Sequence, residues 1–219
     1  MGQKEGIRKI YSGWAPIYEI VHHLQTMWTD SKYRNIVATI VDIQPGERVL
    51  DVSTGTGLTG LAASIKQPDA YVVGIDLTPQ MLYQAQHNIK KNSAEGQFGI
   101  VIGNMEDLPF VNNSFDVIIS MYGIGGIEDR EKAFAEIVRV AKPGARIAAI
   151  EMVSPPMEKR LKRMVHKYLV KPCIKRFWGF RDTEMERLFE KHGISIERTE
   201  FHDEFVLGSS RLVYAVVKK

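Results

Sequence analysis

Short apolar runs alternate with amphipathic stretches along most of this 219-residue chain. The apolar runs lie at 48–52, 71–76, 98–103, 115–120 and 146–153. Runs of this length without a polar face are typical of strands that are buried on both sides. We therefore predict an α/β fold with a parallel sheet covered by helices on both faces. Its ligands should gather at the carboxyl ends of the strands.

The stretches before and between these strands have helical spacing. Helices are expected at 31–43, at 58–66, at 130–141 and from Thr78-Pro79 onward. Residues 7–24 predict a helical arm that is interrupted near Pro16. Apolar residues recur in this arm every three or four positions, which predicts one shared face made of Tyr11, Trp14, Ile17, Tyr18 and Val21. That face either packs on the body of the protein, or lines a pocket as a lid, or does both.

The pattern changes after the fifth apolar run. Residues 157–170 predict a basic amphipathic helix, and Thr183-x-x-Glu186 is a capping box that opens another helix. The last two apolar runs, 194–201 and 211–217, are joined by a loop of nine residues. A loop this short cannot contain a crossover helix, so we expect the two strands to be antiparallel.

The composition is that of a soluble globular protein, with 44% apolar and 25% charged residues. We predict a single domain. It consists of an N-terminal helical arm (1–44), a cofactor-binding sheet core (45–153), a basic cap helix (154–180) and a C-terminal helix with an antiparallel hairpin (181–219). The single cysteine, Cys173, excludes a disulfide framework and agrees with a reducing compartment. Because no signal peptide or membrane-spanning run is visible, we expect a cytoplasmic location.

The net charge of +3 conceals an asymmetry. Residues 158–176 hold eight Lys or Arg and one acid, a local charge of +7 that leaves −4 on the remainder. A basic surface confined to one segment argues against general nucleic-acid binding, and we predict no metal centre. The basic helix at 157–176 is typical either of contact with an anionic membrane, at the inner membrane surface, or of an ordinary cap helix with a solvated face.

Residues 49–60 join the end of the first strand to a glycine-rich turn and the start of a helix. Gly55 and Gly57 allow positive φ and let a ligand approach bare backbone. The helix behind the turn presents unpaired N–H groups to that ligand. The same spacing fits the dinucleotide fingerprint, and Asp76 lies at a suitable distance to hold a ribose. The turn alone therefore leaves the identity of the cofactor open.

Six segments, taken together and in order, carry a family resemblance. They are Tyr11-x-x-Trp14-Ala15-Pro16-x-Tyr18, Val49–Gly57, Gly74-Ile75-Asp76, Gly103-Asn104-Met105-Glu106-Asp107-Leu108-Pro109-Phe110, Phe115–Ser120 and Lys142-Pro143-Gly144. They resemble class I S-adenosylmethionine (SAM)-dependent methyltransferases, in particular the ubiquinone/menaquinone C-methyltransferase group and its phospholipid N-methyltransferase relatives. The resemblance implies a Rossmann-like three-layer αβα sandwich with strand order 3-2-1-4-5-7-6, strand 7 antiparallel, and an N-terminal helical lid.

The resemblance also implies SAM as the cofactor and a set of residues that contact it. The set is Tyr11, Asp51, Ser53, Thr54, Gly55, Gly57, Asp76, Leu77, Met81, Asn104, Met105 and Ser120. Asp76 would take the ribose hydroxyls, while Leu77 and Met81 would flank the adenine. Asp51 either accepts hydrogen bonds from the cofactor's ammonium group or holds the glycine turn.

Two positions depart from the family pattern. Ser53 stands where the family has glycine, and it lacks the freedom of glycine at positive φ. Asn104 stands where the family has an acid that accepts from the adenine amino group. Its amide oxygen can still accept a hydrogen bond, without the strength that a charge would add.

Methyl transfer from a sulfonium needs a positioned nucleophile and the exclusion of water, not a catalytic triad. The expected acceptor-side residues are Tyr122, His22 and Tyr18, and Tyr122 follows the fourth strand at the mouth of the pocket. Gly123 and the two glycines at 125–126 indicate room for a bulky substrate or a plain tight turn.

We therefore predict a SAM-dependent methyltransferase that acts on a lipophilic small molecule. A prenylated aromatic or quinone-type ring is the first choice of acceptor, and an aminophospholipid head group is the second. The alternatives are a nicotinamide-dependent oxidoreductase and a SAM-binding protein without activity. The oxidoreductase would share the glycine turn but would not account for Asp51, the segment 108–110 or the terminal hairpin.

Overall fold

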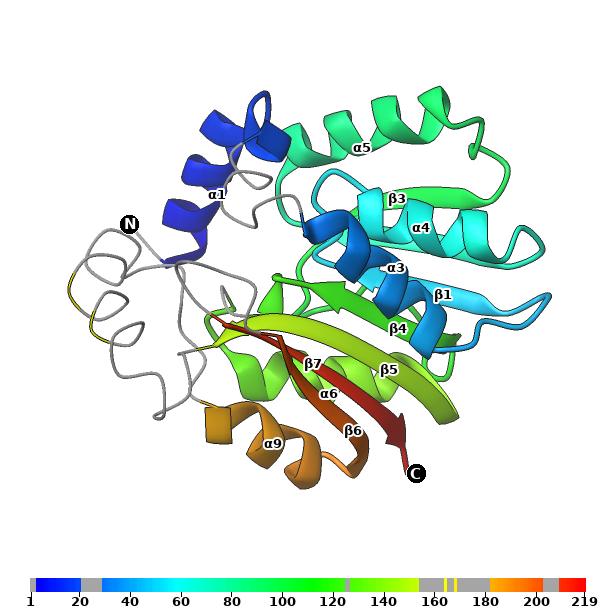
Figure 1. Cartoon of the computed structure of the whole chain (residues 1–219), viewed down its shortest axis with the longest axis vertical. Helices are drawn as coiled ribbons and strands as arrows, with labels where there is room; N and C mark the ends of the chain where they lie inside the picture. The colour runs from blue at the N-terminus through cyan, green and yellow to red at the C-terminus, as the bar shows by residue number, and fades with distance from the viewer. Residues whose placement is uncertain are drawn as a thin grey trace.

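The computed structural model describes residues 3–20, 29–124, 127–153, 182–202 and 209–219, together with Met164 and Tyr168. Seven strands form one sheet in the order β3-β2-β1-β4-β5-β7-β6 (Figure 1). The strands are β1 (Arg48–Val52), β2 (Tyr71–Asp76), β3 (Phe98–Ile102), β4 (Phe115–Met121), β5 (Ala141–Val153), β6 (Ile194–His202) and β7 (Ser209–Val217). β1 to β5 pair in parallel, and β7 is antiparallel to both of its neighbours. The predicted topology is confirmed.

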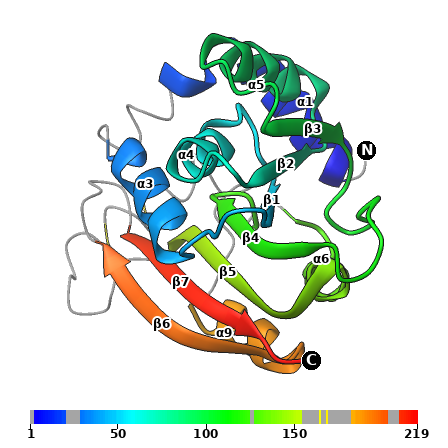
Figure 2. The same cartoon turned by 90° about the vertical axis from the view of Figure 1, so that its right-hand side faces the viewer.

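Helices cover both faces of the sheet. They are α1 (Gln3–Trp14), α3 (Asp30–Ile40), α4 (Leu58–Lys66), α5 (Pro79–Lys91), α6 (Arg130–Val140) and α9 (Asp182–Lys191). Figure 2 shows α3, α4 and α5 on one face, with α6 and α9 on the other. The three-layer arrangement that the strand pattern predicted is therefore present.

Each central strand buries side chains on both faces, which is why its sequence is apolar throughout. Val49 and Val117 belong to the core beneath α3, α4 and α5. Leu50 and Ile118, the next residues along the same strands, belong to the core beneath α6 and α9. Successive side chains of a strand point to opposite faces, so two helical layers require two apolar sets.

Several predicted boundaries differ from the structure: the helix expected at 31–43 ends at Ile40, and the strand expected at 211–217 begins at Ser209. The largest difference lies at the start of β5. The helix expected at 130–141 ends at Val140, and β5 starts at Ala141, where the sequence suggested a turn at Lys142-Pro143-Gly144. Ala141 pairs with Phe115, and the register then shifts before the ladder resumes. Gly144 takes a φ of 78°, so the chain bends within the strand instead of leaving the sheet.

The N-terminal arm is interrupted where Pro16 predicted. α1 ends at Trp14, a turn follows, and helical residues resume at Tyr18. The predicted shared face is wrong, because the turn changes the direction of the side chains. Trp14 and Ile17 are 39% and 50% exposed, whereas Tyr11 and Tyr18 line a cavity with their ring centroids 6.0 Å apart.

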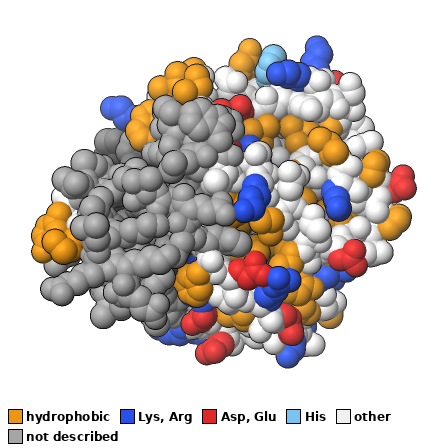
Figure 3. Space-filling model, viewed as in Figure 1, with side chains coloured by type: hydrophobic (Ala, Val, Ile, Leu, Met, Phe, Trp, Pro, Cys, Tyr) orange, Lys and Arg blue, Asp and Glu red, His pale blue; other side chains and the backbone are white. Residues whose placement is uncertain are grey.

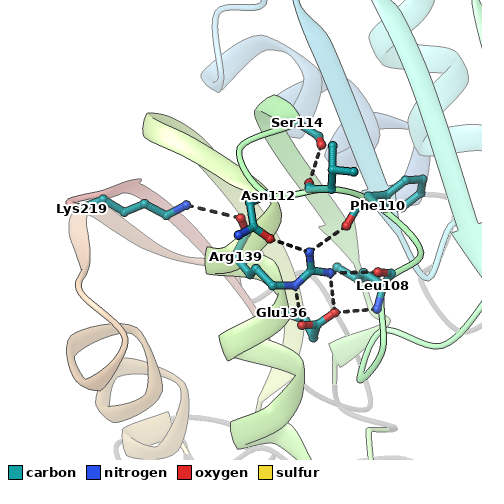
Figure 4. A network of polar contacts seen from close by, with 8 residues as sticks. Leu108, Phe110, Asn112, Ser114, Glu136, Arg139 and Lys219 are labelled. Carbon is teal, nitrogen blue, oxygen red and sulfur yellow. Dashed lines mark hydrogen bonds and ion pairs between the residues drawn. The ribbon is translucent and has the colours of Figure 1, made fainter.

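The loop between β3 and β4 is fastened to α6 by one arginine (Figure 4). Arg139 donates hydrogen bonds to the carbonyl oxygens of Leu108 and Phe110, at 2.9 and 2.7 Å, and pairs with Glu136 at 2.7 Å. Glu136 in turn accepts from the N–H of Leu108 at 2.7 Å. This network fixes the segment that begins at Asn104.

Several sequence predictions concern residues outside the described ranges. These are Val21, His22, Cys173, the glycines at 125–126 and, apart from Met164 and Tyr168, the basic helix at 157–176. Within the described part of the chain, no helix has both the length and the apolar character needed to cross a bilayer.

Candidate active site

A cavity lies at the carboxyl ends of the parallel strands, where the fold predicts a ligand. It is bounded by the turn after β1, the end of β2, the loops after β3 and β4, and the N-terminal arm. It brings together most of the residues that the sequence had selected, namely Tyr11, Tyr18, Ser53, Gly55, Asp76, Leu77, Met81, Asn104, Met105 and Tyr122.

Asp76 connects the end of β2 to the glycine turn. Its Oδ2 accepts a hydrogen bond from the N–H of Gly55 at 2.9 Å, and its Oδ1 accepts from the N–H of Thr78 at 2.8 Å. Burial raises the pKa of Asp76, although these backbone donors act in the opposite direction. Each carboxylate oxygen keeps a lone pair, so the side chain can still accept from two vicinal hydroxyls.

Asp51, on β1, is hydrogen-bonded to the glycine turn and to the start of α4. It is buried, and its Oδ2 accepts from the Thr54 hydroxyl at 2.6 Å and from the N–H of Gly60 at 2.9 Å. Burial raises the pKa of Asp51 to about 7. The sequence left two roles open for Asp51, binding the cofactor's ammonium group or holding the glycine turn. The contacts of Asp51 in the structure are those expected for holding the turn.

Ser53 and Gly123 face each other across the ends of β1 and β4. Ser53 has a φ of 56°, in the region where glycine is normally found. A Cβ atom on Gly123 would lie 2.3 Å from the Cβ of Ser53, closer than two side chains can approach. Gly123 is therefore needed for close packing, which at this position favours the tight turn over the room for a substrate, the two alternatives that the sequence left open.

The loop after β3 forms one end of the cavity. The Oδ1 of Asn104 accepts from the N–H of Glu106 at 3.0 Å, and its carbonyl oxygen accepts from the N–H of Asp107 at 2.9 Å. These bonds shape the loop and leave one lone pair on Oδ1 for a ligand. Met105 is buried beside it and lines the cavity.

Three tyrosines, Tyr11, Tyr18 and Tyr122, also line the cavity. The hydroxyl of Tyr122 lies 3.0 Å from the hydroxyl of Ser210 on β7. Burial raises the pKa values of Tyr11, Tyr18 and Tyr122, with Tyr11 at about 12. Neighbouring carboxylates, Asp76 among them, add to this effect at Tyr11. All three hydroxyls are therefore protonated at neutral pH, so each carries a proton that it can donate in a hydrogen bond.

The remaining predicted contacts lie beside the cavity. Gly57, with a φ of 80°, precedes α4, and a Cβ there would lie 3.1 Å from the Cβ of Ala85, so it serves helix packing. Thr54 donates to Asp51 as described. The buried hydroxyl of Ser120 has no hydrogen-bond partner in the described structure, and the Cβ position of Gly123 is 3.4 Å from it. A buried polar atom of this kind is what a bound ligand can satisfy.

Sequence reasoning missed several residues that line this region. Glu106 and Met121 each directly follow a predicted site residue, so proximity to the motif could have indicated them. Arg34 on α3 lines an adjoining cavity, and no motif or spacing in the predicted helix distinguishes it from the other basic residues.

The cavity fits an adenosyl group. Asp76 offers two acceptors at the position of a ribose, and Leu77, Met81 and Met105 supply apolar walls next to the amide of Asn104. Together with an antiparallel seventh strand, this site defines the class I SAM-dependent methyltransferases. Residues 1–191 match the model of the ubiE/COQ5 methyltransferase family, and the chain belongs to that family. It is a SAM-dependent enzyme, and the oxidoreductase alternative has no support.

Similar proteins agree with this assignment. The chain is 30% identical over 168 residues to the ubiquinone/menaquinone biosynthesis C-methyltransferase UbiE of Geotalea daltonii, covering 76% of this chain and 71% of that protein. It is 29% identical over 172 residues to the demethylmenaquinone methyltransferase of Thermotoga maritima, covering 78% and 72% of the two chains.

Solved structures support the fold. A methyltransferase in complex with the Trm112 activator of Haloferax volcanii matches with a TM-score of 0.74 at 18% identity, covering 95% of this chain and 98% of that one. A geranyl diphosphate methyltransferase in complex with SAM matches with a TM-score of 0.72 at 14% identity, covering 85% and 84%.

Proposed function

We propose that this enzyme transfers the methyl group of SAM to a ring carbon of a lipophilic, quinol-type aromatic compound. The observation that carries the proposal is that the hydroxyl-bearing rings of Tyr18 and Tyr122 line the same cavity as the cofactor residues. Relatives that are named as C-methyltransferases of ubiquinone and menaquinone biosynthesis support the same acceptor class.

The acceptor side is suited to orienting a ring. SAM, when bound, supplies a methyl group on a cationic sulfur, so the protein must position the acceptor and exclude water. Because the pKa values of Tyr18 and Tyr122 are raised by burial, their hydroxyls stay protonated. They can donate to the oxygens of a quinol, but they are poor acceptors for its proton. His22, which lies outside the described residues, remains our candidate for that proton.

A membrane-facing surface would explain how a prenylated acceptor reaches the site. Exposed apolar side chains gather on the N-terminal arm (Figure 3), and they are Trp14, Ile17 and Ile20. Met164 and Tyr168, at 50% and 62% exposed, belong to the basic segment 157–176. Apolar side chains combined with Lys and Arg favour anionic lipid surfaces. The enzyme would then work in the cytoplasm at the inner face of the membrane.

A panel of acceptors tests the proposal. The purified enzyme and SAM are incubated with a short-chain demethylmenaquinol, a catechol and phosphatidylethanolamine, each in detergent micelles, and products are followed by mass spectrometry. The menaquinol precursor should gain one methyl group. Methylation of the lipid alone would replace the proposed acceptor with an aminophospholipid. Tight SAM binding without any product from the panel would favour the inactive SAM-binding protein.

A further inference from the structure

A second cavity adjoins the first on the side of α3. Its volume is about 40 Å³, and it is bounded by the glycine turn, the start of α4, the end of β4 and Arg34 from α3. Ser53, Gly55 and Tyr122 line both cavities, so the two spaces meet across the glycine turn. Figure 2 shows α3 next to α4 on this face of the sheet.

Arg34 brings a nearly buried positive charge to this cavity. Its side chain is 12% exposed, and one terminal nitrogen pairs with Oδ2 of Asp30 at 2.5 Å. Among the residues that the structure describes, the guanidinium makes no other ion pair or hydrogen bond, although its charge also acts on Tyr18 and Asp51. A guanidinium carries five N–H donors in a planar fork, so most of its donors are available to a group in the cavity.

The order of the strand ends indicates which part of the cofactor reaches Arg34. Asn104 follows β3, Asp76 ends β2 and the glycine turn follows β1, while the second cavity lies at β4. Adenine and ribose contacts therefore lie on one side of the glycine turn, and Arg34 lies on the other. If the adenosine part of SAM occupies the first side, its methionyl part crosses the glycine turn and extends toward Arg34.

We propose that Arg34 binds the α-carboxylate of the methionyl part of SAM and thereby selects SAM over adenosyl compounds that lack this group. The inference rests on SAM being the cofactor. Thr56 and Thr59 line the same cavity, and the first N–H groups of α4 lie beside it. Hydroxyl groups and a helix N-terminus both favour an anion, which adds to the effect of the guanidinium.

A matched pair of ligands isolates the carboxylate. Decarboxylated SAM keeps the adenosyl group, the sulfonium and the amine, and differs from SAM only in that group. Isothermal titration calorimetry with the wild-type protein should show SAM binding about 10- to 100-fold more tightly, the range expected for charged hydrogen bonds. Arg34→Gln should remove most of this difference by weakening SAM alone, and Arg34→Lys should restore part of it.

Two further variants control for charge and for folding. Lys32→Gln removes a positive charge from the same helix and should leave the preference for SAM unchanged. Because Arg34→Gln removes the ion pair of the buried carboxylate of Asp30, the double variant Asp30→Asn/Arg34→Gln keeps the pair neutral and should also lose the preference.

The outcomes distinguish the role of Arg34 from the identity of the cofactor. If the folded wild-type protein binds both ligands equally, or if Arg34→Gln weakens both equally, the role of Arg34 is overturned while the cofactor stands. If neither ligand binds, the cofactor itself is overturned, and the role of Arg34 with it.

Discussion

The two ends of the active site are held together in different ways. At the cofactor end, the carboxylates of two buried strand residues accept hydrogen bonds from backbone N–H groups. Asp76 accepts from Gly55, and Asp51 accepts from Gly60. These contacts depend on the path of the main chain, which the sheet fixes, so this end is expected to change little when a ligand binds.

At the acceptor end, Tyr18 comes from the N-terminal arm, whereas Tyr122 directly follows the central strand β4. The arm is tied to α5 by the hydroxyl of Ser12, which donates to Gln80 at 2.8 Å, and by the amide of Asn88, which donates to Glu19 at 2.8 Å. Asn88 also donates to the carbonyl oxygen of Thr56 at 3.0 Å, so it links the arm to the glycine turn.

This difference explains why the cofactor is easier to infer than the acceptor. A main-chain cradle requires the same residue types wherever it occurs, whereas a wall of side chains can be altered without changing the fold. The following experiments test the contrast, beginning with the largest expected effect.

Replacing Asp76 should damage the cofactor end most. Asp76→Ala removes the ribose acceptors and frees the N–H of Gly55, so calorimetry should show SAM affinity falling by about 1.5–3 kcal/mol, the scale of hydrogen bonds to charged groups. Asp116→Ala is the matched control, because Asp116 lies at the start of β4 and binds Lys142 and the N–H of Arg48. An unchanged affinity in Asp76→Ala would exclude this residue from the site.

The contact between Ser53 and Gly123 joins the two ends and should tolerate no added atom. Gly123→Ala is expected to lower the free energy of unfolding by about 1–3 kcal/mol, as overpacking does. Ser53→Gly removes the obstacle, so the double variant should recover most of the loss in urea denaturation. Gly96→Ala is the control, since a Cβ there has nothing within 4 Å. Equal stability of Gly123→Ala and Gly96→Ala would contradict the close packing.

Changing a tyrosine should affect the acceptor end alone. Tyr122→Phe removes the hydroxyl that lies near Ser210 and that we expect to orient the acceptor. The specificity constant for the quinol should fall by about tenfold, roughly the value of one hydrogen bond, with SAM affinity unchanged. Tyr83→Phe, on the exposed face of α5, should change neither quantity. A parallel loss of SAM affinity in Tyr122→Phe would place Tyr122 at the cofactor instead.

The last test concerns the buried carboxylate beneath the turn, whose effect is a slope of stability against pH and not a change in ligand affinity. The pKa of Asp51 rises from an ordinary value of about 3.9 to about 7 on folding. The folded state then binds more protons than the unfolded state between about pH 4 and pH 7, so stability falls as pH rises through this window.

Asp51→Asn removes this contribution. Its free energy of unfolding, measured in urea at several pH values, should decline less steeply than that of the wild type. The difference is limited to about 1.4 kcal/mol per pH unit for one proton. Asp76, whose pKa is also raised, keeps part of the slope. Equal slopes in the wild type and in Asp51→Asn would contradict the assignment.

The sequence predicts the sheet well because each strand is apolar on both faces, a pattern that only a doubly covered parallel sheet produces. It also selects the cofactor residues, since Gly55 and Asp76 belong to short local motifs. It fails where distant segments meet. The start of β5 depends on a pairing between Ala141 and Phe115, and the contact of Gly123 with Ser53 crosses about 70 residues.

Arg34 is the clearest example of a residue that local patterns cannot identify. It lies in the middle of an ordinary amphipathic helix, and its position beside the glycine turn results from how α3 packs on the sheet. The split of the arm has a similar origin, because the turn at Ala15–Ile17 sends Tyr11 and Tyr18 inward and leaves Trp14 exposed.

The central claim is that the enzyme binds SAM mainly through main-chain groups and transfers its methyl group to a ring carbon of an acceptor held beside Tyr18 and Tyr122. Its most direct test is a reaction of the purified enzyme with a short-chain demethylmenaquinol and SAM labelled with carbon-13 in the methyl group, followed by NMR of the product. We predict a labelled methyl signal in the range of an aryl carbon substituent. A labelled signal in the range of a methyl ether, or no transfer of label by an enzyme that binds SAM, would contradict the account.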